Sequence, residues 1–78
     1  MSRAYEEIID FIAGGPSPAE VAEFSPSKLA KDRIAELIHR EKAGGLTENE
    51  RSELKHCLEL EHLMRLAKAR AREHISKE

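Results

Sequence analysis

The segment from Thr47 to Ile75 constrains the fold more than any other part of the chain. It contains no glycine or proline and is rich in Leu, Glu, Lys, Arg and Ala, the residues with the highest helix propensities. Thr47 and Glu50 form a capping-box pattern, in which each side chain accepts a hydrogen bond from the other residue's backbone N–H. The segment therefore predicts one helix over about residues 47–76, roughly 40 Å long at about 1.5 Å per residue.

A helix of this length exceeds the diameter of a small globular domain, which is about 30 Å. Its apolar residues between Leu54 and Leu66 lie on more than one side, which is typical of a helix covered from several directions. A heptad-like 3-4 spacing begins at Cys57. We expect either that this helix dimerises or that the short helices of the chain fold along it. The predicted partner or dimer interface is Cys57, Leu60, Leu63, Met64, Ala67 and Ala71.

A short amphipathic helix is predicted at the start of the chain, over residues 4–13. Its apolar stripe has helical spacing and consists of Tyr5, Ile8, Ile9 and Ile12. Phe11 lies off this stripe. The helix ends at Gly14-Gly15-Pro16, because glycine permits a left-handed cap and proline cannot continue the hydrogen-bond ladder.

Two further helices are predicted before the long one. Ser17-Pro18-Ala19-Glu20 is a second capping box and begins a brief helix anchored by Phe24. Ser25-Pro26 begins the next helix, with Leu29 expected to pack on Phe24 as a hydrophobic staple. The apolar stripe of this helix is Ala30, Ile34, Leu37 and Ile38.

The break at Gly44-Gly45 between two amphipathic helices predicts an antiparallel αα-hairpin. The predicted fold is all-α and forms a single domain over residues 1–78. Two short N-terminal helices pack on an αα-hairpin with a long C-terminal helix, and we expect a helical dimer.

Cellular location is inferred from the cysteine content and from the N-terminus. Cys57 is the one cysteine, so an internal disulfide is excluded and a reducing compartment is favoured. Residues 1–13 contain two glutamates where a signal peptide would need an apolar run. No apolar stretch approaches the roughly 20 residues of a membrane span. We expect a cytoplasmic protein that does not associate with a membrane.

Catalytic and metal-binding motifs are weak in this sequence. Glu36/His39 and Glu59/His62 have the Glu-x-x-His spacing of di-iron bundles, but both pairs point away from the apolar stripes. Cys57 lacks an activating base and is expected to act as a small buried hydrophobe. The chain has no Walker motif and no G-x-S-x-G motif. We expect no enzymatic activity, no metal and no cofactor.

The net charge is −2, but the N-terminal part is acidic and the C-terminal part is basic. The residues of a possible face for an anionic partner are Arg65, Lys68, Arg70 and Arg72. Residues 17–34, SPAEVAEFSPSKLAKDRI, resemble the helix-turn-helix opening of MerR-type regulators, but lack three residues between its two blocks. The alternative function is therefore a helix-turn-helix-like DNA-binding regulator that uses residues 17–34 or the basic 65–72 face.

Much of the chain also resembles a group of short, largely uncharacterised bacterial proteins. The similar segments are Tyr5–Ala13, Gly15–Pro18, Gly44–Thr47 and Leu60–Ala71. Genes of this group often neighbour genes for HNH-type nucleases, which is an antitoxin-like arrangement. The resemblance implies a possible toxin-like nuclease partner. The function expected from the sequence is a small, homodimeric protein–protein interaction module without enzymatic activity.

Overall fold

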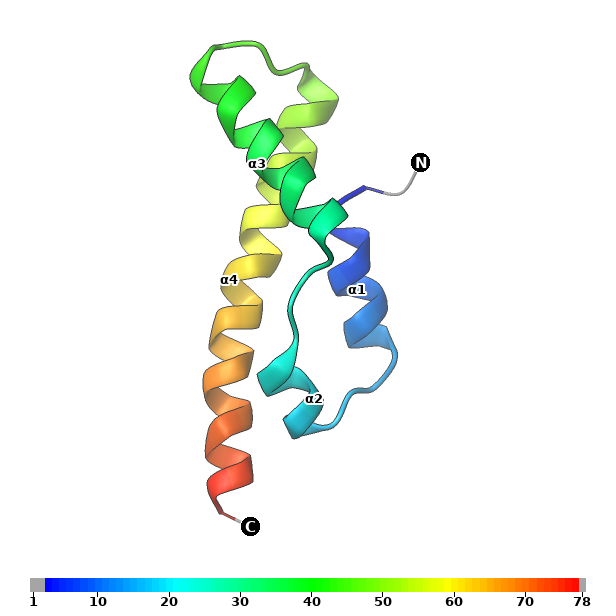
Figure 1. Cartoon of the computed structure of the whole chain (residues 1–78), viewed down its shortest axis with the longest axis vertical. Coiled ribbons are helices and arrows are strands. Elements are labelled where there is room, and N and C mark those ends of the chain that lie inside the picture. Colours follow the sequence, from blue (N-terminus) through cyan, green and yellow to red (C-terminus); the bar gives the residue numbers. More distant parts are fainter. Residues whose placement is uncertain (1–2, 78) are drawn as a thin grey trace.

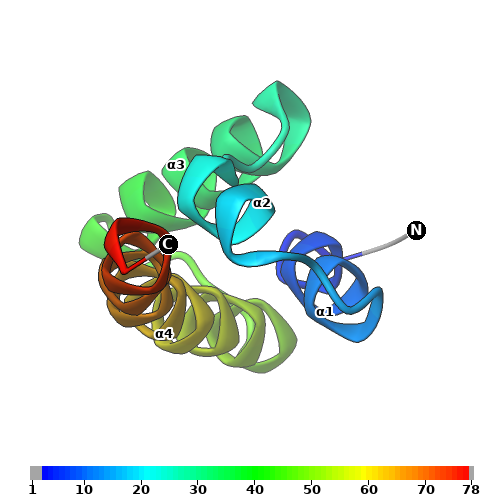
Figure 2. The ribbon, with the colours of Figure 1, turned by 90° about the horizontal axis from the view of Figure 1, so that it is seen from below.

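The computed structural model describes residues 3–77, which form four helices. These are α1 (Glu6–Ala13), α2 (Pro18–Glu23), α3 (Lys28–Lys42) and α4 (Glu48–Ser76). Helix α4 runs the length of the molecule, which measures 48 × 23 × 19 Å (Figure 1). The view along α4 shows the three shorter helices on one side of it (Figure 2). The all-α fold predicted from the sequence is confirmed.

Helix α4 begins at the predicted cap. The Thr47 hydroxyl accepts a hydrogen bond from the Glu50 N–H at 3.1 Å, and the Glu50 carboxylate accepts one from the Thr47 N–H at 3.0 Å. These two bonds satisfy N–H groups that have no partner within the helix. From this cap the helix continues without interruption for 29 residues.

Helices α3 and α4 form the predicted hairpin. Each contributes a fully buried leucine, Leu37 from α3 and Leu54 from α4. The chain turns at Gly44, whose φ of +75° is a left-handed conformation that glycine adopts without the steric cost of a side chain. Gly45 follows with an ordinary φ, and its N–H donates to the Arg40 carbonyl at 2.9 Å.

Helix α3 begins two residues later than predicted, and this changes its first turn. Ser27 is the N-cap, and its hydroxyl accepts a hydrogen bond from the Ala30 N–H. The carboxylate of Glu7 in α1 accepts bonds of 2.6 Å from both the Ser27 N–H and the Ser27 hydroxyl. This contact between residues 20 positions apart holds the cap at Ser27 rather than Ser25.

The aromatic contacts of the N-terminal region also differ from the prediction. Phe11 stacks on Phe24, with ring centroids 4.3 Å apart, although its place off the apolar stripe had suggested otherwise. Leu29 does not form the predicted staple and is 84% exposed, because the later start of α3 turns it outward. Tyr5 packs against His56 of α4, with ring centroids 5.1 Å apart and the ring planes tilted by 55°. Small buried residues, Ala4, Ala30 and Cys57, then complete the core where the N-terminal segment, α3 and α4 meet.

Candidate partner-binding surfaces

The predicted interface on α4 is largely covered by the chain itself. Cys57, Met64 and Ala71 are buried, and Leu60 and Ala67 are partly buried. This part of α4 faces the short helices, with α2 packed along its C-terminal half (Figure 1). The seam of residues with heptad-like spacing that begins at Cys57 is therefore covered as in the second of the two arrangements expected from the sequence, in which the short helices fold along the long one. Of the six predicted residues, Leu63 alone is exposed.

The opposite side of α4 has no covering within the described chain. At about 100° per residue, Leu63 and Leu66 point away from Cys57, and their exposed fractions are 50% and 54%. Leu58, at the edge of this side, is 46% exposed. We call this side the outer face of α4. Its central residues, all exposed, are Lys55, Glu59, His62, Leu63, Leu66, Arg70 and Glu73.

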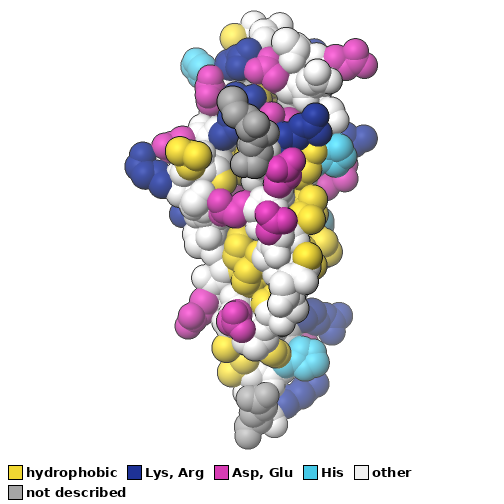
Figure 3. Space-filling model, turned by 90° about the vertical axis from the view of Figure 1, so that its right-hand side faces the viewer, with side chains coloured by type: hydrophobic (Ala, Val, Ile, Leu, Met, Phe, Trp, Pro, Cys, Tyr) yellow, Lys and Arg dark blue, Asp and Glu magenta, His cyan; other side chains and the backbone are white. Residues whose placement is uncertain are grey.

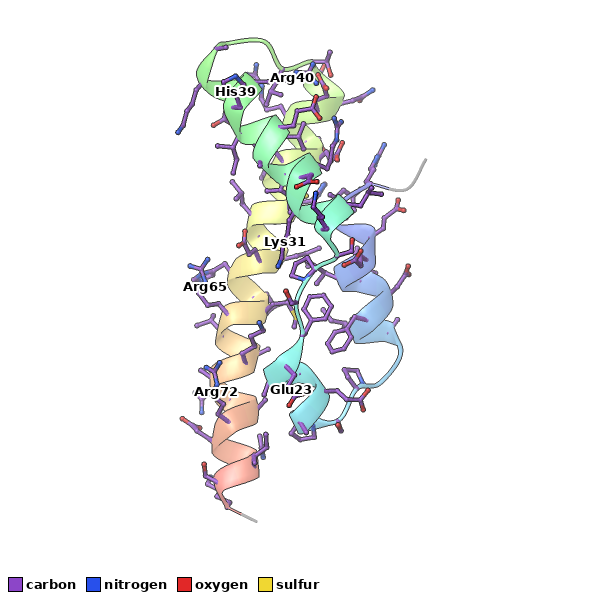
Figure 4. The ribbon with its side chains drawn as sticks, in the orientation of Figure 1. Glu23, Lys31, His39, Arg40, Arg65 and Arg72 are labelled. Atoms are coloured by element: carbon purple, nitrogen blue, oxygen red, sulfur yellow. The ribbon has the colours of Figure 1, made fainter. Side chains whose placement is uncertain are left out.

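Three of the four basic residues near the C-terminus, Arg65, Lys68 and Arg72, lie within about 60° of one another around α4, and Arg70 lies on another side. Arg65 and Arg72 project from the same side of α4, away from α2 (Figure 4). Arg70 lies on the outer face and pairs with Glu73 at 3.6 Å. Lys68 is partly buried beside a groove of about 140 Å³ that is also lined by Ile8, Phe24, Pro26, Glu61, Met64 and Arg65. Arg65 in turn pairs with Glu61 at 3.7 Å.

Residues 17–34 do not adopt a compact helix-turn-helix arrangement. Helices α2 and α3 lie at different levels along α4 and are joined by residues 24–27, which run between them (Figure 1). Each packs on α4. In a helix-turn-helix unit, the two helices pack on each other and one crosses the DNA backbone while the other enters the major groove. This geometry does not favour DNA recognition by residues 17–34.

A second candidate surface, absent from the sequence predictions, is a cleft of about 530 Å³ between α1 and α3. Its charged lining residues are four carboxylates and two arginines, Glu6, Glu7, Asp10, Glu36, Arg3 and Arg33. The exposed Leu29 stands at its edge. Acidic and hydrophobic side chains lie side by side on the face that carries α1 (Figure 3). The acidic N-terminal part of the sequence could have indicated the carboxylates of this surface. The other wall is the beginning of α3, whose start differs from the predicted one.

Two arginine–glutamate pairs link α3 to α4 and are therefore structural. Arg33 donates two hydrogen bonds of 3.2 Å to Glu53, a carboxylate that is almost fully buried. The hydrogen bond that Arg33 donates to Glu53 raises the pKa of Arg33. Arg40 donates to Glu50 at 2.9 Å, near the turn (Figure 4). The pKa of Glu50 is lowered chiefly by the Thr47 N–H that it accepts, and also by Arg40. These charged side chains are already paired with each other within the hairpin.

The candidate chemical groups lie apart from one another. Burial raises the pKa of the Cys57 thiol to about 11, with a further contribution from Glu53 and Glu61. This thiol is protonated at neutral pH, whereas a cysteine nucleophile requires the thiolate. The two Glu-x-x-His pairs are exposed on separate helices, α3 and α4. Residues 3–77 contain no group of three or more His, Cys, Asp or Glu side chains placed to hold a metal ion.

Comparisons with known proteins found no family model, no curated protein and no solved structure that matches this chain. Within the described residues, none of the helices combines the length and the apolar character needed to cross a membrane. Two surfaces stand out in the described part of the chain. They are the outer face of α4 and the carboxylate-rich cleft between α1 and α3.

Proposed function

We propose that this chain is a protein–protein interaction module that has no catalytic activity and works as a homodimer. The observation that carries the proposal is the exposure of Leu63 and Leu66 on the outer face of α4. The short helices cover the other side of α4, so this apolar surface is left for a separate molecule. Contiguous apolar patches on small proteins commonly mark sites of interaction.

The energy available at this surface supports association. Full burial of a leucine side chain contributes about 1.5–3 kcal/mol. Leu58, Leu63 and Leu66 are each about half exposed, so covering all three recovers a substantial part of that energy.

We further propose that the module binds a toxin-like nuclease of the HNH type. The support is chemical complementarity at the cleft between α1 and α3. Proteins that act on nucleic acid present Lys and Arg side chains to phosphates. Carboxylates such as Glu6 and Asp10, beside the exposed Leu29, offer a basic protein surface both charge partners and an apolar anchor.

Sedimentation over a wide concentration range tests the homodimer. We expect a monomer–dimer equilibrium in the parent chain and a monomer in Leu66→Asp, because the substitution places a charge in the apolar contact. Circular dichroism should show that this variant stays helical, since position 66 is outside the core. Leu29→Asp is the matched control and should dimerise normally. A parent chain that is monomeric at every concentration would refute the homodimer.

Co-expression with the product of the neighbouring gene, which the proposal expects to be an HNH-type nuclease, tests the second part of the proposal. We expect the two proteins to co-purify and nuclease activity to fall in the complex. Asp10→Lys should weaken the complex, because it reverses one charge at the edge of the cleft. Glu48→Lys, at an exposed position outside the lining of the cleft, is the control. Failure to co-purify would remove the nuclease as partner and leave the homodimer to its own test.

A further inference from the structure

The charges on the outer face of α4 follow an ordered pattern around the exposed leucines. Read toward the C-terminus, the face carries Lys55 and Glu59, then the leucines, then Arg70 and Glu73. Successive members are three or four residues apart, so they form one stripe along the helix. The stripe therefore reads positive, negative, apolar, apolar, positive, negative.

This pattern is complementary to itself when reversed. The midpoint of the stripe lies between Leu63 and Leu66. A second copy of α4 that runs antiparallel about this midpoint places Glu59 opposite Arg70, and places Lys55 one residue, or about 1.5 Å along the axis, from the position opposite Glu73. The leucines of the two copies meet at the centre. A parallel copy would instead place each charge beside the same charge, which is unfavourable.

We infer that a second copy of this chain binds the outer face of α4 in an antiparallel, two-fold arrangement centred between Leu63 and Leu66. The inference rests on the proposed homodimer and specifies its surface and direction. A two-fold interface uses the same patch on both molecules, so each pair of residues occurs twice. In this register Ala69 of one copy lies two residues, or about 3 Å along the axis, from the position opposite Leu58 of the other, and adds an apolar group at one edge.

The charges of the stripe are available for such a contact. Lys55 and Glu59 form no ion pair among the residues that the structure describes. Arg70 and Glu73 pair with each other, but both side chains are largely exposed. Exposed pairs of this kind contribute little to stability, so their partners can be exchanged at low cost. The contact from Lys55 to Glu73 is about 27 Å long at about 1.5 Å per residue.

Charge reversal with compensation tests the register. Glu59→Arg creates two contacts between arginines in the antiparallel dimer, and Arg70→Glu creates two contacts between glutamates. We expect each single variant to weaken dimerisation roughly tenfold at low salt. The double variant Glu59→Arg/Arg70→Glu restores both pairs with reversed polarity, so its dissociation constant should return close to that of the parent.

Two controls separate this effect from a change in net charge. Glu41→Arg and Lys42→Glu make the same charge changes at exposed positions of α3, and neither should alter dimerisation. High salt should reduce the difference between the single variants and the parent, because exposed charges are screened. Sedimentation gives the dissociation constant of every variant, and circular dichroism confirms that each is folded.

The outcomes distinguish this inference from the proposed function. If the parent chain and Leu29→Asp dimerise but Leu66→Asp does so equally well, the dimer uses another surface and the inference is wrong. If Leu66→Asp is monomeric but the single charge reversals are not weakened, the outer face is used in another register and the antiparallel arrangement is wrong. If the parent is always monomeric, the homodimer itself fails.

Discussion

Cys57 shows how the surroundings of one side chain determine its chemistry. The sequence presents a lone cysteine beside a histidine, which could be a reactive pair. In the structure the thiol is fully buried with Ala4 and Ala30, while the His56 ring packs against Tyr5. Burial disfavours the thiolate because a charge loses its hydration in an apolar environment. The residue behaves as the small hydrophobe that the sequence had suggested.

This burial predicts a loss of stability at high pH. The pKa of Cys57 is about 11 in the folded chain, compared with an ordinary value of 9.0. Between these values the unfolded chain releases the thiol proton while the folded chain retains it. The free energy of unfolding therefore falls as the pH rises through this window. Below the window, the buried protonated thiol makes its full contribution to stability.

Urea denaturation at a series of pH values measures this effect. Cys57→Ala is the control, because it lacks the thiol but keeps every other group that titrates at high pH. The parent should lose more stability than Cys57→Ala between about pH 9 and pH 11. Parallel losses in the two proteins would show that the thiol ionises as readily in the folded chain as in the unfolded one.

The individual helices could be predicted from the sequence because their end signals are local. The Thr47-x-x-Glu50 box and the Ser17-x-x-Glu20 box both form as expected. The start of α3 was not predictable in the same way. Ser25 and Ser27 are both reasonable caps, and the choice depends on Glu7, which belongs to another helix. A contact between residues this far apart cannot be predicted from the local sequence pattern around Ser25 and Ser27.

The pattern on α4 also identified apolar residues without showing which side the chain would cover. Cys57, Met64 and Ala71 follow heptad-like spacing, which is equally suited to a second helix of another molecule or to short helices of the same chain. The structure brings α2 to this seam and leaves Leu63 and Leu66 exposed. Most of the predicted interface residues therefore lie on the side of α4 that the chain itself covers.

At the scale of the whole molecule, α2 packs closely along α4, whereas α1 is held in place by a small number of side-chain contacts. The aromatic pairs Phe11–Phe24 and Tyr5–His56 contribute, as does the bond from Ser27 to Glu7. The cleft between α1 and α3 depends on this attachment, because Glu7 lines it while holding the α3 cap. The α3–α4 hairpin has its own buried leucines and two arginine–glutamate pairs.

Removing the Glu7 carboxylate should therefore loosen α1 without opening the hairpin. We expect Glu7→Ala to lower the free energy of unfolding by about 1–2 kcal/mol, because two hydrogen bonds to a charged but partly exposed group are lost. Hydrogen exchange should accelerate in α1 and in the first turn of α3, and remain slow around Leu37 and Leu54. Glu6→Ala, which makes the same change in the same helical turn, is the control and should have a smaller effect. Equal destabilisation by the two variants would mean that Glu7 contributes only its charge, and that the Ser27 cap is held by α3 itself.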